Sequence, residues 1–179
     1  HDRDLFSWLS LHSGPILSRQ KEVLVQMVEW CSRIKLGVVE MDEREKSGER
    51  ARLNLGHTIG HALEAASGYT DWKHGDGVAV GMMVAAFISV SRGEMSILQF
   101  EELYSLLKKF NLPVKASIGW KKLLPYLKID KKFVSSRPRV VLPKGIGESV
   151  LTDDITLADL ENAYREVSLY GEKTGLSCG

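Results

Sequence analysis

Apolar residues recur at helical spacing through the first half of the chain. After Pro15 they return every three or four positions, which predicts one long amphipathic helix that ends before Gly37; the positions are Leu17, Leu24, Met27, Val28, Cys31 and Ile34. Residues 53–66 predict a second helix, which Ser67-Gly68 ends. Residues 75–92 predict a third helix, and because it is apolar on nearly all sides we expect it to be buried.

The second half begins with the same spacing and then changes period. Ser96 is placed to cap a helix that ends at Asn111-Leu112-Pro113, and residues 120–127 predict one more short helix. Residues 139–143 and 148–151 instead read as two short strands around a glycine-containing turn. Thr156 is placed to cap a last helix with an apolar stripe at Leu157, Leu160, Ala163, Tyr164 and Val167. The predicted fold is therefore mainly α with one small β-hairpin.

Length and charge narrow the class of protein. The 179 residues, 44% of them hydrophobic, fit one compact domain, which we place at residues 1–170 with a disordered tail at 171–179. The formal net charge is only +1, so no basic surplus favours nucleic acid as a partner.

The chain shows no targeting signal. Its longest apolar stretch, residues 77–90, contains Gly81 and Ser89 and is shorter than the roughly 18 residues that span a bilayer, so no membrane association is expected. The two cysteines and the absence of a secretory signal favour the cytoplasm. Because the chain starts without Met, on residues typical of a chain interior, we expect a piece of a longer protein.

Three of the five histidines fall within eighteen residues. His57 and His61 are four apart and so share one face of the predicted helix, which Glu64 extends, and His74 directly precedes the next helix. One such histidine is usually a hydrogen-bonded structural residue, but three together favour a metal site, and neutral imidazoles bind zinc well.

Two glycines interrupt the helix that carries these histidines. Gly56 and Gly60 each cost about 1 kcal/mol of helix propensity relative to Ala. They predict that either a ligand or a neighbouring helix approaches this backbone closely.

Polar residues on either side of the histidines fit an anionic substrate, although each has a plainer explanation. Arg50 and Asn54 are four apart and are predicted to share a face one turn before His57, but an exposed Arg and a capping Asn would explain them equally well. Composition favours a solvated connector over residues 40–52, and Lys35 and Asp130-Lys131-Lys132 are by themselves typical of a solvated surface.

A long motif covers these positions. It runs through residues 50–64 (RARLNLGHTIGHALE), Gly68-Tyr69, Trp72, His74-Gly75 and Gly81-Met82, and extends to Lys35, Val38-Val39, residues 42–45, 111–113 and 130–132, and Ile146-Gly147. It resembles the 3-dehydroquinate synthase family of the shikimate pathway. The resemblance implies the family's helical C-terminal domain, which holds zinc and most substrate contacts, without the N-terminal Rossmann-like domain that binds NAD.

The resemblance also implies roles for individual residues. His57 and His74 would be zinc ligands, whereas His61 would contact substrate, which differs from the pairing of His57 with His61 that spacing favours. Lys35, Arg50 and Asn54 would join His61 as catalytic residues, and Asp42 with Lys131 or Lys132 would bind substrate.

The implied activity is that of a carbon–oxygen lyase. It converts a seven-carbon sugar acid phosphate, 3-deoxy-D-arabino-heptulosonate 7-phosphate, into 3-dehydroquinate and phosphate, with NAD and with zinc or cobalt, in an enzyme that is commonly a homodimer. One alternative is a related sugar-phosphate cyclase, and another is a metal-dependent polyol dehydrogenase, which needs none of the phosphate-binding cations. A third is a domain without activity of its own, because the chain has no Gly-x-Gly-x-x-Gly fingerprint after a predicted strand.

The sequence departs from the family in three places. The family's third zinc ligand, a Glu followed three residues later by an active-site Lys, belongs to a segment that would precede Asp2, so we expect weaker zinc binding or substitution by Glu64 or His61. One extra residue lies between Lys35 and Arg50. Asp76 and Gly77 replace the more usual Glu and Ala after His-Gly.

Overall fold

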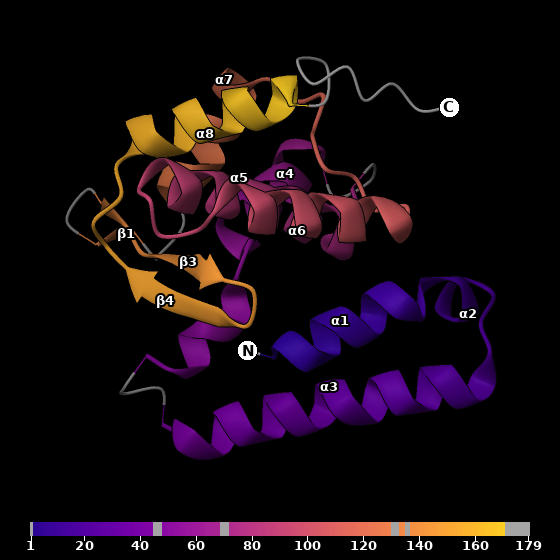
Figure 1. Cartoon of the computed structure of the whole chain (residues 1–179). Helices are drawn as coiled ribbons and strands as arrows, with labels where there is room; N and C mark the ends of the chain where they lie inside the picture. Colours follow the sequence, from indigo (N-terminus) through magenta and orange to yellow (C-terminus); the bar gives the residue numbers. More distant parts are fainter. Residues whose placement is uncertain (1, 45–47, 69–71, 130–132, 135–136, 171–179) are drawn as a thin grey trace.

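The computed structural model describes residues 2–44, 48–68, 72–129, 133–134 and 137–170, so the tail expected at 171–179 lies outside the described residues. The elements in chain order are α1 (Arg3–Leu11), α2 (Ser13–Leu17), α3 (Lys21–Met41), the 3-10 helix η1 (Arg50–Asn54), α4 (His57–Ala66), α5 (His74–Ser91), α6 (Ile97–Lys109), α7 (Trp120–Ile129), β1 (Phe133–Val134), β2 (Arg137–Pro138), β3 (Val140–Gly145), β4 (Glu148–Thr152) and α8 (Leu157–Leu169). Helices α4–α8 and the strands form one body, and α1–α3 form an arm below it (Figure 1).

Helix α5 is the centre of the body. It packs against α4, α6, α8 and β3, and the side chains of Leu63, Val84 and Phe100 in this cluster are fully buried. The expected burial of this helix is therefore confirmed. Its 18 residues are long and apolar enough to cross a membrane, which corrects the shorter run expected from the sequence, but 56% of them are buried inside the fold, as in the core helix of a globular protein.

Glycines set the distance between α4 and α5. A Cβ atom on Gly77 would lie 2.9 Å from the carbonyl oxygen of Gly60, and a Cβ atom on Gly81 would overlap the carbonyl oxygen of Gly56. The two backbones therefore touch where any side chain would hold them apart. Of the two explanations for Gly56 and Gly60, the structure shows the neighbouring helix.

The predicted caps and the predicted hairpin are confirmed. Ser96 accepts a hydrogen bond from the backbone N–H of Gln99 at the start of α6, and Thr156 accepts one from that of Asp159 at the start of α8. Because Thr156 donates to the Asp159 carboxylate in return, the pKa of Asp159 is lowered. Strands β3 and β4 pair antiparallel, and a further short pair, β1 with β2, was not predicted.

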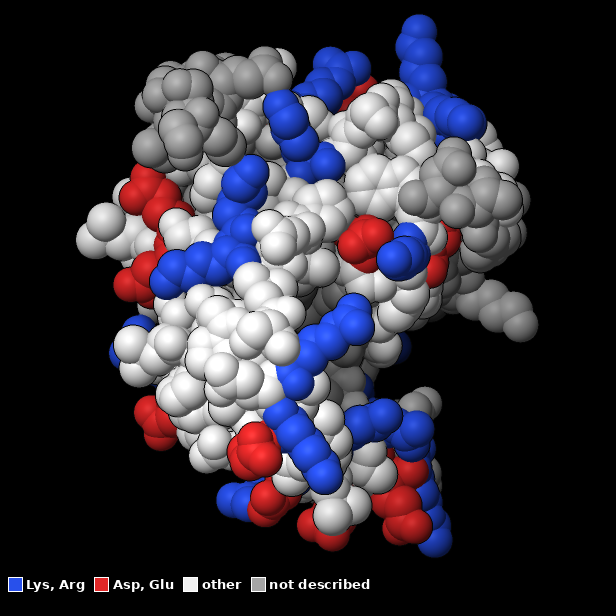
Figure 2. Space-filling model, turned by 90° about the vertical axis from the view of Figure 1, so that its right-hand side faces the viewer, with Lys and Arg blue, Asp and Glu red and all other residues white. Residues whose placement is uncertain are grey.

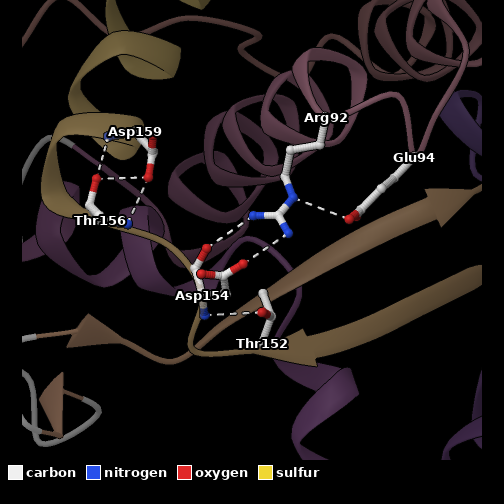
Figure 3. Close-up of polar contacts among 6 residues, drawn as sticks. All are labelled: Arg92, Glu94, Thr152, Asp154, Thr156 and Asp159. Atoms are coloured by element: carbon white, nitrogen blue, oxygen red, sulfur yellow. Dashed lines mark hydrogen bonds and ion pairs between the residues drawn. The ribbon is translucent and has the colours of Figure 1, made fainter.

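Arg92 joins the end of α5 to the loop that leads into α8 (Figure 3). Its Nε donates to Glu94 Oε1 at 3.1 Å, while Nη1 and Nη2 donate to the Asp154 carbonyl oxygen at 3.0 Å and to Asp154 Oδ2 at 3.3 Å. These hydrogen bonds raise the pKa of Arg92. The guanidinium thus fixes the β4–α8 loop against the core helix.

The arm differs from the single helix predicted between Pro15 and Gly37. The chain leaves α2 after Leu17, Arg19 takes a left-handed backbone (φ 59°), and α3 begins at Lys21. Helix α3 then runs through Gly37 to Met41, because one interior glycine costs too little to end a helix of 21 residues.

Helix α1 was not predicted. The carboxylate of Asp2 caps it by accepting from the Leu5 backbone N–H at 2.7 Å, and also accepts from Trp30 Nε1 of α3 at 3.0 Å. The first of these hydrogen bonds is the main cause of a lowered pKa at Asp2. One residue thus both starts α1 and ties it to α3.

Much apolar surface of the arm is exposed. Within α1–α3 only Ile16 and Val38 are buried, whereas Val25, Val28 and Leu36 are each 58% exposed. Figure 2, which views the side where α2 lies in Figure 1, shows Lys and Arg side chains down the middle of this face and broad uncharged surface beside them.

Candidate metal and substrate site

Helices α4 and α5 bring three histidines to one place. His57 and His61 lie one turn apart on α4, and His74 is the first residue of α5. Each offers a ligand atom, and these atoms all lie within 4.8 Å of one another. The imidazole ring centroids are 5.1–5.7 Å apart. The clustering expected from the sequence is thus present in three dimensions.

Hydrogen bonds orient two of the three rings. Nδ1 of His57 lies 3.2 Å from the carbonyl oxygen of Leu55, and Nδ1 of His74 lies 3.3 Å from the carboxylate of Glu64. Among the described residues, no hydrogen bond is found on the ring of His61. These contacts fix the orientation of the two rings, and the two residues are those that the resemblance implies as metal ligands.

The donor set fits a borderline divalent cation. Two nitrogens bound to one tetrahedral zinc at about 2.0–2.1 Å lie about 3.4 Å apart. The ligand atoms here are within 4.8 Å, and rotations of these half-buried or exposed side chains can bring them to that distance. Neutral imidazoles suit zinc and cobalt better than magnesium or calcium.

The residues before His57 form a 3-10 helix, not the first turns of α4. Gly56, with a left-handed backbone (φ 82°), separates η1 from α4, so the helix predicted from Leu53 begins four residues later. A 3-10 helix has about three residues per turn, so residues four apart do not share a face. The predicted common face of Arg50 and Asn54 is therefore wrong, although both residues lie on η1, directly before the histidines.

Asp42 holds the start of η1. It ends α3 and is only 5% exposed, and its Oδ2 accepts a hydrogen bond from the backbone N–H of Arg50 at 3.2 Å. On the other side of η1, Arg52 donates to Glu49 at 2.6 Å and to Ser149 of β4 at 3.4 Å. The solvated connector expected over residues 40–52 thus contains a buried carboxylate.

Of the three predicted site lysines, the structure describes only Lys35. Lys35 is exposed on α3, six residues before the end of that helix. Lys131 and Lys132 lie outside the described residues.

Sequence reasoning missed what supports the site. The contact with the Leu55 carbonyl has no sequence signal, because every residue has a backbone carbonyl. Glu64 did have a signal, three positions after His61, but was considered only as a substitute ligand.

The chain resembles known proteins over most of its length. Residues 1–133 match the family described as 3-dehydroquinate synthase C-terminal. The 3-dehydroquinate synthase of Colwellia psychrerythraea is 38% identical over 162 residues, which cover 89% of this chain and 46% of the relative. That of Pseudoalteromonas atlantica is 36% identical over 157 residues, or 87% and 44%. The chain thus spans about half the length of the curated relatives it matches.

Solved structures share the fold. A 2-epi-5-epi-valiolone synthase from Streptomyces hygroscopicus subsp. jinggangensis with NAD+ and Zn2+ bound superposes with a TM-score of 0.79 at 19% identity, covering 92% of this chain and 46% of that chain. A 2-deoxy-scyllo-inosose synthase complexed with carbaglucose-6-phosphate, NAD+ and Co2+ superposes with a TM-score of 0.69 at 26% identity, covering 82% and 41%. The mainly helical fold expected from the sequence is confirmed.

Proposed function

The chain belongs to the 3-dehydroquinate synthase family, and we propose that it forms the metal- and substrate-binding part of a sugar-phosphate cyclase with 3-dehydroquinate synthase activity. The observation that carries this proposal is the cluster of His57, His61 and His74 directly after η1, inside the segment that matches the family. A relative of known structure binds Zn2+ and NAD+, and another binds Co2+ and NAD+, which supports the same cofactors here.

His57 and His74 are the proposed metal ligands, because contacts at Nδ1 orient both rings and because the ligand atoms of the cluster lie within 4.8 Å of one another. When bound, zinc polarises the substrate hydroxyl that is to be oxidised, and NAD accepts and returns the hydride. His61, whose ring lies beside both ligands, is then placed to orient the substrate at the metal.

Basic and polar residues elsewhere in the chain are proposed to bind the two anionic ends of a sugar acid phosphate. Arg50, Lys35 and one lysine of the Lys131-Lys132 pair carry fixed positive charge, which suits carboxylate and phosphate through charge-assisted hydrogen bonds. Asn54, on η1 with Arg50, offers a neutral amide for a substrate hydroxyl. Asp42 contributes to substrate binding through Arg50, whose backbone it holds.

A dinucleotide-binding domain is the proposed partner of this chain. The relatives are about twice as long, and the neighbours of known structure that bind NAD+ are also covered by less than half. The exposed apolar side chains of α3 supply a surface for such a domain or for a second copy in a homodimer. The complete assembly is proposed to work in the cytoplasm, without nucleic acid or membrane.

Phosphate release tests this function. We would mix the heptulosonate phosphate with NAD and zinc, and compare this chain alone with this chain plus the separately produced N-terminal half of the Colwellia relative. Release in the mixture supports the proposal, and no release in either sample contradicts the activity while family membership stands. Release only from glucose 6-phosphate, whose carba analogue the inosose synthase binds, would identify a different cyclase of the same fold.

Two variants then test the roles of the histidines. His57→Ala is expected to abolish zinc binding and activity together. His61→Ala is expected to keep bound zinc and to lose turnover. Equal zinc content in the unaltered chain and in His57→Ala contradicts the ligand assignment.

A further inference from the structure

The glycine contacts between α4 and α5 determine which residue faces His74. The helices run antiparallel at this contact, with Gly56 opposite Gly81 and Gly60 opposite Gly77. Counting from the pair of Gly60 and Gly77, four residues forward along α4 is Glu64, and four residues back along α5 is residue 73. Glu64 therefore comes opposite residue 73, next to His74. The register that the glycines impose therefore delivers one carboxylate to the ring at the start of α5.

The observed contact agrees with this register. Both carboxylate oxygens of Glu64 lie 3.3 Å from Nδ1 of His74, and the Glu64 side chain is only 14% exposed, against 56% for His74. A carboxylate only accepts hydrogen bonds, so in the neutral form of His74 Nδ1 carries the hydrogen and Nε2 has the lone pair. Glu64 thus selects the form of His74 that binds a metal through Nε2.

We propose that Glu64 is a positioning residue for the metal site: it holds the tautomer and the orientation of His74, and it does not bind the ion itself. This inference rests on the proposed function, because it assumes that His74 is a ligand. A carboxylate on the second ring nitrogen increases the basicity of an imidazole and fixes its direction, and its removal typically costs about 10- to 100-fold in metal affinity. The contact at His74 is the more exposed of the two that orient the rings, and a charged carboxylate makes it. The contact at His57 is made by the neutral Leu55 carbonyl.

Zinc affinity of the 179-residue chain tests the proposal directly. Competition against a chromophoric chelator would be measured for the unaltered chain and for Glu64→Ala, Glu64→Gln and Asp76→Asn. Asp76 is the matched control, because it lies in the first turn of α5 and its removal takes away one negative charge two residues from His74 without touching the ring contact. Melting curves of the metal-free variants exclude a general loss of fold.

A graded order of affinities is expected. Glu64→Ala should lose about 10- to 100-fold in zinc affinity. Glu64→Gln should lose less, because its amide oxygen still accepts from Nδ1. Asp76→Asn should stay within about twofold, because the half-buried Asp76 makes no hydrogen bond to the His74 ring. Equal affinities for Glu64→Ala and Asp76→Asn would overturn the proposal.

Two spectroscopic measurements separate positioning from direct ligation. Ring nitrogen shifts in the metal-free chain should place the His74 hydrogen on Nδ1 and should show a mixture of tautomers in Glu64→Ala. The visible absorption of the Co2+ form should keep its intensity in Glu64→Ala, because the number of ligands is unchanged. A changed cobalt spectrum, with equal losses in Glu64→Ala and Glu64→Gln, would make Glu64 a ligand and overturn the positioning role.

The outcomes also distinguish this inference from the proposed function. If the unaltered chain binds no zinc, or if His57→Ala binds zinc equally well, the metal site itself is wrong and both proposals fail. If the graded order appears but no phosphate is released in the mixture of domains, the role of Glu64 stands and only the cyclase activity fails.

Discussion

Helices α3 and α5 are the two longest helices among the described residues, and they differ in how far their apolar side chains are buried. In α5, ten residues are buried, whereas in α3 only Val38 is. Helical spacing of apolar residues therefore predicts that a helix forms, but it does not predict whether the partner of its apolar face lies in the same chain. The body buries its apolar residues against other parts of the same chain, whereas the arm leaves most of its apolar residues exposed.

The two regions are consequently stabilised by different interactions. The body gains free energy by removing apolar area from water, at roughly 25 cal/mol per Å². The arm depends on helix propensity and on a few polar contacts, such as Trp30 Nε1 to Asp2 and Lys109 Nζ to Ser10 Oγ at 2.9 Å. Substitutions of the same kind should therefore have unequal effects in the two regions.

The largest difference is expected for truncation of apolar side chains. Phe100→Ala, at a fully buried position in the body, should lower the free energy of unfolding by about 3–5 kcal/mol. Val28→Ala, at an exposed position on α3, should change it by less than about 0.5 kcal/mol. Urea unfolding measures both, and similar losses would show that the arm is packed in solution.

Glycine substitutions should have opposite signs in the two regions. Gly81→Ala places a methyl group on the Gly56 carbonyl and should cost about 1–3 kcal/mol or more, because the two backbones must separate. Gly37→Ala meets nothing within 4 Å and should stabilise α3 by about 0.5–1 kcal/mol. Thermal unfolding distinguishes them, and a stabilising Gly81→Ala would contradict the observed contact.

Alkaline pH should weaken the body through Tyr164. This residue is 3% exposed and donates to the Ile118 carbonyl at 2.6 Å, and burial raises its pKa to about 12. The folded state therefore holds the phenolic proton more tightly than the unfolded state, whose pKa is about 10. The resulting stability is complete below pH 10 and is lost as the pH rises toward 12.

Tyr164→Phe is the control for that pH dependence. It should cost about 1 kcal/mol at neutral pH, because the Ile118 carbonyl loses its donor. It should also lose less stability than the unaltered chain between pH 10 and 12. Identical slopes for the two proteins, in unfolding curves at several pH values, would assign the alkaline transition to other groups.

The smallest difference concerns ion pairs. Arg92→Met removes two hydrogen bonds to Asp154 in the β4–α8 loop and one to Glu94, and should cost about 1 kcal/mol. Arg33→Met removes only the exposed pair with Glu29 on α3, at 2.9 Å, and should cost about 0.3 kcal/mol. High salt should reduce both effects, and a larger loss at Arg33 would reverse the comparison.

The sequence predicted the body better than the arm for physical reasons. Helices α5, α6 and α8 have caps or apolar patterns that nearby residues determine, such as Ser96 and Thr156. The break at Arg19 has no such marker, because a left-handed arginine is held by the surrounding structure and not by its own preference. Helix α1 has a local cap at Asp2, but the contact of Asp2 with Trp30, which ties α1 to α3, spans 28 positions.

The site was predictable where its chemistry is carried by side-chain type. Clustering of His57, His61 and His74 followed from spacing, and their ligand atoms do meet. That Arg50 lies on a 3-10 helix separate from α4 was not predictable. A glycine such as Gly56 can lie inside a helix at some cost in stability, or it can end one helix with a left-handed backbone. The contacts of Leu55 and Glu64 require the register of two helices, which no single segment encodes.

The antiparallel glycine contact also sets the distance between the helices that carry the histidines. Gly56 and Gly60 meet Gly81 and Gly77 through backbone atoms, so no side chain lies between α4 and α5 at these positions. A single methyl group at Gly77 or Gly81 would therefore move His74 relative to His57. Residues that never touch a metal thus limit which ion can be bound as strictly as the ligands do.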